Sequence, residues 1–145
     1  MSDSTTLRFF FDYVDPASYL LELSLRERQG PTTFLLEPHP FELTPPPHPM
    51  VDPEDPEVAR YWEEMTEVGH GLGISLQRPW IVPWSRKAHE LAARAREYGW
   101  FRAIHDALFR AYLVEGRDIG RVDILVDLAR KAGMDAMETK AALDV

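Results

Sequence analysis

The first apolar stretch of the chain leads directly into a helix signal. Leu7 to Val14 is an aromatic and β-branched run, which is typical of a strand buried on both faces with a parallel partner. Asp15 is a residue type that caps helices, and Pro16 suits a first helical position because it has no N–H to lose. Apolar residues then recur at helical spacing as far as Gln29, and residues 32–37 predict a second strand. The pattern therefore predicts a βαβ unit.

Beyond residue 55 the apolar positions recur at helical spacing, and glycines separate most of the segments. Ser85 is an expected N-cap, and Asp135 with Glu138 forms a capping-box pattern. The expected helices span residues 56–68, 86–98, 100–115, 122–132 and 136–143. We therefore expect a helical bundle joined to the βαβ start.

The segment between these two parts is rich in proline. Eight of the twelve prolines lie between residues 38 and 56, which is incompatible with a helix or a central strand and predicts extended chain on the surface. A rigid connector is the main interpretation, and a ligand for a proline-binding partner is the alternative. Phe41 and Leu43 are expected to anchor this segment to the core.

Size and charge limit the class of protein. A chain of 145 residues that is 45% hydrophobic suits one globular α/β unit, which we divide into a βαβ start (1–37), a connector (38–56) and a helical domain (57–145). The net charge of −8 argues against nucleic acid and anionic membrane as partners. Because the sequence has neither a secretory signal nor a run long enough to span a membrane, we expect a cytoplasmic protein.

The chain has no cysteine. This excludes disulfides, thiolate metal sites and thiol redox chemistry by this chain alone. The five histidines are scattered without the spacing that would place two on one metal, so no metal site is predicted. Neither a glycine-rich phosphate loop nor a serine-nucleophile elbow is found.

Four segments resemble the DsbA-like branch of the thioredoxin superfamily: residues 9–20, 40–43, 88–91 and, most specifically, 107–119. The resemblance covers nearly the whole chain. It implies an α/β fold in which a helical bundle is inserted into a thioredoxin-like βαβ unit, with the C-terminal strands of that fold outside this chain. It also implies kinship with FrnE-like oxidoreductases, 2-hydroxychromene-2-carboxylate isomerases and kappa-class glutathione transferases.

The sequence departs from these families at the positions of their catalytic residues. Asp15 stands at the position of the attacking cysteine, or of the serine that contacts glutathione sulfur, and Ser18 stands at the second cysteine. Dithiol activity is not expected, because it needs a thiolate. A carboxylate would also repel a glutathione thiolate. Trp84 occupies the place of an asparagine that often precedes segment 88–91, which removes another polar contact to glutathione.

Several of these residues have two interpretations. Asp15 is mainly an N-cap, with a functional carboxylate as the alternative, and Ser18 either bonds back to the turn or faces a ligand. Tyr13 and Tyr19 are core aromatics or phenol donors, and His89 is a packed or solvated histidine or one that faces the site. The candidate site, as the resemblance implies it, has Asp15 and Ser18 as catalytic residues and Tyr13, Pro16, Tyr19 and Trp84 as substrate contacts.

Two functional hypotheses remain open. The first is glutathione-linked isomerisation or transfer on a small aromatic substrate, with glutathione as the cofactor that the resemblance implies. The second is a non-catalytic module that binds an apolar ligand or a partner's segment. Because the first strand would keep an unpaired edge, made of Phe9, Phe10 and Phe11, we expect homo-oligomers or a partner that supplies the missing strands.

Overall fold

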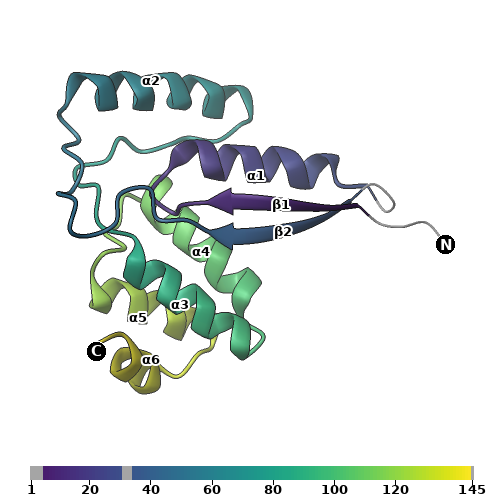
Figure 1. The fold of residues 1–145 in the computed structure, drawn as a ribbon, viewed down its shortest axis with the longest axis vertical. Coiled ribbons are helices and arrows are strands. Elements are labelled where there is room, and N and C mark those ends of the chain that lie inside the picture. The colour runs from purple at the N-terminus through teal and green to yellow at the C-terminus, as the bar shows by residue number, and fades with distance from the viewer. Residues whose placement is uncertain (1–4, 31–33, 145) are drawn as a thin grey trace.

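The computed structural model describes residues 5–30 and 34–144. Figure 1 shows two parallel strands, with α1 and α2 on one side in this view and α3 to α6 on the other. The elements in chain order are β1 (Thr5–Phe11), α1 (Pro16–Arg28), β2 (Phe34–Pro40), α2 (Pro56–Gly71), α3 (Arg86–Glu97), α4 (Phe101–Leu113), α5 (Val122–Ala132) and α6 (Ala136–Leu143). The predicted βαβ unit and the helical remainder are both confirmed.

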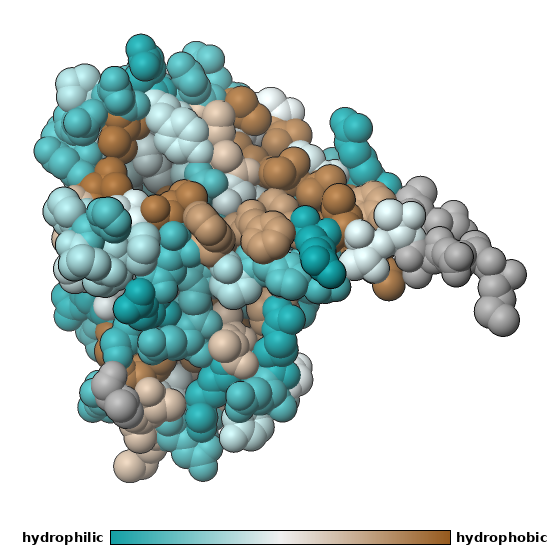
Figure 2. Space-filling view, in the orientation of Figure 1, coloured by the Kyte–Doolittle hydropathy of each residue, from teal (hydrophilic) through white to brown (hydrophobic). Residues whose placement is uncertain are grey.

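The strand β1 has one buried face and one exposed face. Phe9 and Phe11 are buried, whereas Phe10 between them is 61% exposed. The prediction of a strand buried on both faces was therefore wrong. Alternate side chains of a strand point to opposite faces, and the ring of Phe11 packs with His89 of α3 and Phe109 of α4. Figure 2 shows apolar surface in the band that contains the strands and α1.

The strand β2 extends into the proline-rich segment. It runs parallel to β1, with Thr5 opposite Phe34 and Phe11 opposite Pro40, so the predicted end at residue 37 was wrong. The amide of Phe41 donates to the Phe11 carbonyl at 2.8 Å. Amides two residues apart along a strand point to the same edge, so the nitrogens of Pro38 and Pro40 face away from β1. An edge strand tolerates proline in that orientation. Residues 32 and 33, where the second strand was expected to begin, lie outside the described residues.

Phe41 and Leu43 do not anchor the connector. Their side chains are 55% and 56% exposed, so this prediction was also wrong. The connector is held at this point by a backbone contact instead, because the Leu43 amide donates to Asp12 Oδ2 at 2.8 Å.

The helix boundaries follow local signals. Asp15, Asp55 and Asp135 are N-caps whose side chains accept backbone N–H bonds, whereas Ser85 caps α3 without a side-chain bond. The helix α2 continues past the predicted break at Gly69 to Gly71. A Cβ at Gly69 would lie 2.9 Å from the Ile74 carbonyl oxygen, so glycine allows the following loop to pack closely against the helix.

The core lies between the sheet and the helices. Phe11 and Tyr13 pack with Phe109 of α4, at ring-centroid distances of 5.8 Å and 4.9 Å. The core extends through α3, α4 and α5 to Leu143 of α6. The turn between β1 and α1 therefore rests directly on this core.

Among the described residues, no helix combines the length and apolar character needed to cross a membrane.

Candidate functional site

The turn between β1 and α1 holds Asp15 in a closed set of hydrogen bonds. Its carboxylate accepts from the Ala17 amide at 3.3 Å and the Ser18 amide at 3.1 Å. It also accepts from Ser18 Oγ at 2.7 Å and from the Tyr61 hydroxyl at 2.5 Å. The N-cap interpretation of Asp15 is confirmed. The carboxylate occupies the amide-rich end of α1, which is the position that favours an anion.

The hydroxyl of Ser18 makes two hydrogen bonds within the turn. Its oxygen accepts from the Asp12 amide at 3.2 Å while its proton goes to Asp15. The residue is only 8% exposed. Of the two interpretations of Ser18, the structure has the one in which it bonds back to the turn. Catalytic roles for Asp15 and Ser18 stay predictions.

Tyr61 of α2 closes the turn from the other side. Burial raises the pKa of its phenol well above the usual value, and the hydrogen bond to Asp15 raises it further. The phenol therefore remains a donor across the physiological range. A role for Tyr61 was not predicted, because its helical spacing with Trp62 and Met65 indicates only a core face.

Beneath the turn, Asp12 pairs with a histidine from α3. His89 Nε2 lies 3.1 Å from Asp12 Oδ1, and both side chains are buried. Because Oδ2 accepts from the Leu43 amide, the carboxylate is fixed from two sides. His89 Nδ1 is buried and has no hydrogen-bond partner in the described part of the chain. His89 is thus a packed, buried histidine beneath the turn, which is the first of its two interpretations.

A second buried network starts from Tyr13. Its hydroxyl lies 2.8 Å from His105 Nδ1, and His105 Nε2 lies 2.8 Å from both carboxylate oxygens of Glu22. Burial, followed by the charge of Glu22, raises the pKa of Tyr13 well above the usual value. Tyr13 is 0% exposed, so its phenol serves this network and does not reach the surface.

The other predicted contacts are dispersed. Pro16 is buried at the first position of α1, and Tyr19 stacks on Phe109 with ring centroids 5.2 Å apart. Trp84 is partly exposed, and its indole N–H donates to the His48 carbonyl at 3.0 Å. It lines a cavity of 440 Å³ together with Arg86. The structure therefore brings Asp15 and Ser18 together and leaves Trp84 at a different site.

The arrangement sets clear chemical limits. With no cysteine in the chain, the turn cannot perform thiol–disulfide exchange with its own side chains. Its carboxylate and hydroxyl are already paired with each other. Within residues 5–30 and 34–144, no three side chains of His, Cys, Asp or Glu come together in a way that could hold a metal ion.

These features agree with a comparison against known families. The DSBA-like thioredoxin domain model matches residues 6–145, and the chain belongs to this family. It is 30% identical over 142 residues to the uncharacterized protein YwbO of Bacillus subtilis (strain 168), which covers 95% of this chain and 71% of that protein. The family assignment therefore holds from β1 to α6.

Solved structures show the same fold. A probable DsbA oxidoreductase from Streptomyces coelicolor matches 97% of this chain and 68% of its own, with a TM-score of 0.77 and 20% identity. The cytosolic disulfide reductase DsbM from Pseudomonas aeruginosa matches 96% of this chain and 69% of its own, with a TM-score of 0.69 and 17% identity. DsbM was also solved with glutathione, and that structure has a TM-score of 0.68 and 19% identity to this chain. At these identities the likeness establishes the fold alone.

Four polar residues of these two networks were not predicted as site residues: Asp12, Glu22, Tyr61 and His105. Asp12 and Glu22 are carboxylates inside otherwise apolar patterns, which is a usable signal because such groups are buried only with partners. Tyr61 and His105 had no comparable signal. They reach the turn and Tyr13 from positions 46 and 92 residues away in the chain.

Proposed function

We propose that this chain is a redox-inactive member of the DsbA-like family that works as a binding module. The observation that carries the proposal is the closure of the turn: the Asp15 carboxylate and the Ser18 hydroxyl are hydrogen-bonded to each other. In a redox-active relative, the end of this helix stabilises a thiolate. Here a carboxylate stands at the same end, and the hydroxyls of Ser18 and Tyr61 donate to it.

The ligand class of this module is a small aromatic or apolar molecule, and its location is the cytoplasm. The cytosolic disulfide reductase DsbM, which has the same fold, supports a cytoplasmic location. The net charge of −8 disfavours nucleic acid and anionic membranes as partners. The exposed side chain of Phe10 supports assembly through the sheet, either with a second copy or with a partner that adds strands.

Glutathione-linked isomerisation or transfer is the second candidate, and glutathione in a DsbM structure favours it. In this candidate Ser18 would need to release Asp15 and donate to the glutathione sulfur. The Asp15 carboxylate opposes this step, because two negative charges would then share the end of α1.

A pair of assays tests the proposal. The native protein should not reduce insulin disulfides, and it should not accelerate conjugation of glutathione to 1-chloro-2,4-dinitrobenzene. Conjugation that disappears in Ser18→Ala would establish the second candidate instead. Glutathione at a hundredfold excess over its dissociation constant would stabilise a binding protein by about 2.7 kcal/mol, so thermal unfolding with and without it reports binding separately from turnover.

Assembly is tested by sedimentation. The protein should associate at micromolar concentration, and Phe10→Lys should reduce the association by placing a charge on the exposed face of β1. A monomeric native protein at that concentration would contradict this part of the proposal and leave the binding function untouched.

A further inference from the structure

A second cavity lies between α4 and α5. Its volume is 310 Å³, which is at the lower end of the roughly 300–1,000 Å³ of small-molecule pockets. Ala103 and Ala107 line it one turn apart on α4, and Leu128 and Ala132 line it one turn apart on α5. None of the lining residues belongs to the turn between β1 and α1. The cavity is therefore a separate place on the molecule, and its floor is apolar.

Three cationic side chains line the same cavity. Arg110 comes from the last turn of α4 and Lys131 from the last turn of α5. Arg117 follows α4, and its amide donates to the Ala111 carbonyl at 2.8 Å, so the chain turns back over the end of that helix. Glu115 is the one carboxylate among the lining residues that the structure describes. The lining therefore carries more positive than negative charge.

Arg117 and Lys131 contact a single oxygen atom. Arg117 Nη2 lies 2.8 Å and Lys131 Nζ lies 3.1 Å from Oδ2 of Asp127. Arg130 pairs with the other oxygen of this carboxylate at 2.9 Å and lies outside the cavity. Arg117, followed by Lys131 and Arg130, holds the pKa of Asp127 well below its usual range. Because two cavity-lining nitrogens contact the same oxygen, one further anion in the cavity can contact both.

Positive charge is in excess around this cavity, although the whole chain has a net charge of −8. Glu115 lies 3.8 Å from Arg110, so these two charges offset each other. Asp127 carries one charge and pairs with three cations, so two of the cations are not offset. A phosphate monoester carries about 1.5–2 negative charges at pH 7, whereas a carboxylate carries one. Phosphate is therefore the anion whose charge matches the excess.

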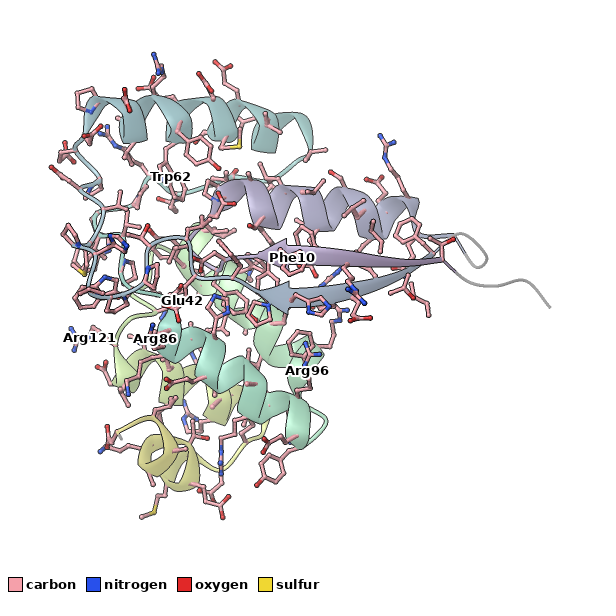
Figure 3. The ribbon with its side chains drawn as sticks, viewed as in Figure 1. Phe10, Glu42, Trp62, Arg86, Arg96 and Arg121 are labelled. Atoms are coloured by element: carbon pink, nitrogen blue, oxygen red, sulfur yellow. The ribbon has the colours of Figure 1, made fainter. Side chains whose placement is uncertain are left out.

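The other carboxylates of α4 and α5 are already paired. Asp106 of α4 contacts Arg26 at 2.6 Å and Arg102 at 3.8 Å. Asp123 of α5 contacts Arg121 at 3.0 Å. Figure 3 shows Arg121 at the edge of the molecule, just before α5 begins. These acids therefore leave the positive charge at the cavity in excess.

We propose that this cavity binds a phosphate monoester that carries a compact apolar group. The phosphate contacts Arg117 and Lys131, and the apolar group lies on the alanines of α4 and on Leu128. The guanidinium of Arg117 presents a planar fork of donors that suits phosphate. Within the described residues, Asp127 is the one side chain to which this guanidinium donates. The site goes beyond the proposed function, because it is separate from the turn and does not depend on the redox inactivity of the chain.

Calorimetric titration of the native protein with phenyl phosphate tests the proposal. Two analogues isolate the contacts: inorganic phosphate lacks the apolar group, and benzoate carries a single negative charge. Each should bind about tenfold more weakly, which corresponds to about 1.4 kcal/mol. The amide resonances of Ala103 and Ala107 should shift with phenyl phosphate and shift less with inorganic phosphate. Benzoate that binds as tightly as phenyl phosphate would contradict the assignment of a phosphate.

Three variants complete the experiment. Lys131→Gln should weaken binding of phenyl phosphate about tenfold, and it should fold normally because this side chain is largely exposed. Glu115→Gln removes the opposing carboxylate and should strengthen binding about two- to fivefold. Arg121→Gln is the matched control, because it removes the same charge outside this cavity, and it should leave the affinity unchanged. Absent saturable binding, or equal affinities of Lys131→Gln and Arg121→Gln, would overturn the proposal.

Discussion

Two clusters flank the end of β1, and each contains one tyrosine and one carboxylate. Asp15, Ser18 and Tyr61 close the turn at the rim, where the surroundings are partly exposed. Tyr13 reaches Glu22 through His105 inside the core, where all three side chains are buried. The two clusters therefore contain similar hydrogen bonds, but one is partly exposed and the other is buried. Burial decides how much each bond contributes to the stability of the protein.

The two clusters differ in what a polar group can bind after it loses its hydrogen-bond partner. At the rim, water can hydrogen-bond to a group that loses its partner, so the net cost is small. In the core no water is at hand, so a polar group left alone retains its full desolvation penalty. We therefore expect the inner cluster to control stability and the outer cluster to control the shape of the turn.

The largest effect is expected for Glu22→Ala. The variant leaves the buried Nε2 of His105 without its partner and breaks the ion pair with Arg26, so we expect a loss of about 3–5 kcal/mol. Unfolding in urea measures the loss. The matched control is Glu27→Ala on the exposed side of the same helix, which should stay within about 0.5 kcal/mol of the native protein. Equal losses in the two variants would mean that the buried contacts of Glu22 contribute nothing to stability.

Tyr13→Phe and Tyr61→Phe compare the clusters atom for atom, because each removes one hydroxyl. Tyr13→Phe leaves His105 Nδ1 buried without a partner and should cost about 1–3 kcal/mol. Tyr61→Phe leaves Asp15 with its three other donors and should cost about 0.5–1.5 kcal/mol. Chemical denaturation of both variants gives the two losses in free energy of unfolding. A larger loss for Tyr61→Phe would mean that the outer cluster contributes more to stability than the inner one.

Asp15→Ala should destabilise the protein by about 0.5–2 kcal/mol, the usual cost of losing an N-cap. Asp15→Asn keeps an acceptor for the amides and should recover most of this loss. If the asparagine variant is as unstable as the alanine variant, the negative charge at the end of α1 matters more than the cap. Thermal unfolding of the two variants, side by side, distinguishes these contributions.

The smallest effect at neutral pH comes from tyrosine ionisation. The pKa of Tyr13 is raised in the folded protein by burial, whereas an unfolded tyrosine titrates near about 10. Its stabilising contribution is therefore complete below about pH 10 and is lost as the pH rises from there toward the folded pKa. The free energy of unfolding should fall more steeply above pH 10 in the native protein than in Tyr13→Phe. Parallel curves for the two proteins would mean that the pKa of Tyr13 is the same in the folded and unfolded states.

Local signals were enough for much of the fold. The helices α5 and α6 occupy the predicted residues, because Gly133 ends one and Asp135 caps the other. The N-cap role of Asp15 was equally visible in the sequence. The strands were predicted less well, since β2 continues through Pro38 and Pro40 and β1 exposes Phe10. Whether a strand is covered on one face or two depends on neighbours that its own residues do not specify.

The sequence by itself determined the order of elements, the capped start of α1 and the absence of thiol chemistry, because periodicity, capping and composition are properties of neighbouring residues. Only the tertiary structure decided which distant groups meet at the turn. Tyr61, His89 and His105 reach it from three different helices, and their contacts with Asp15, Asp12 and Tyr13 depend on how those helices pack. Contacts between residues far apart in the chain produce no local sequence pattern, so they are visible only in the folded structure.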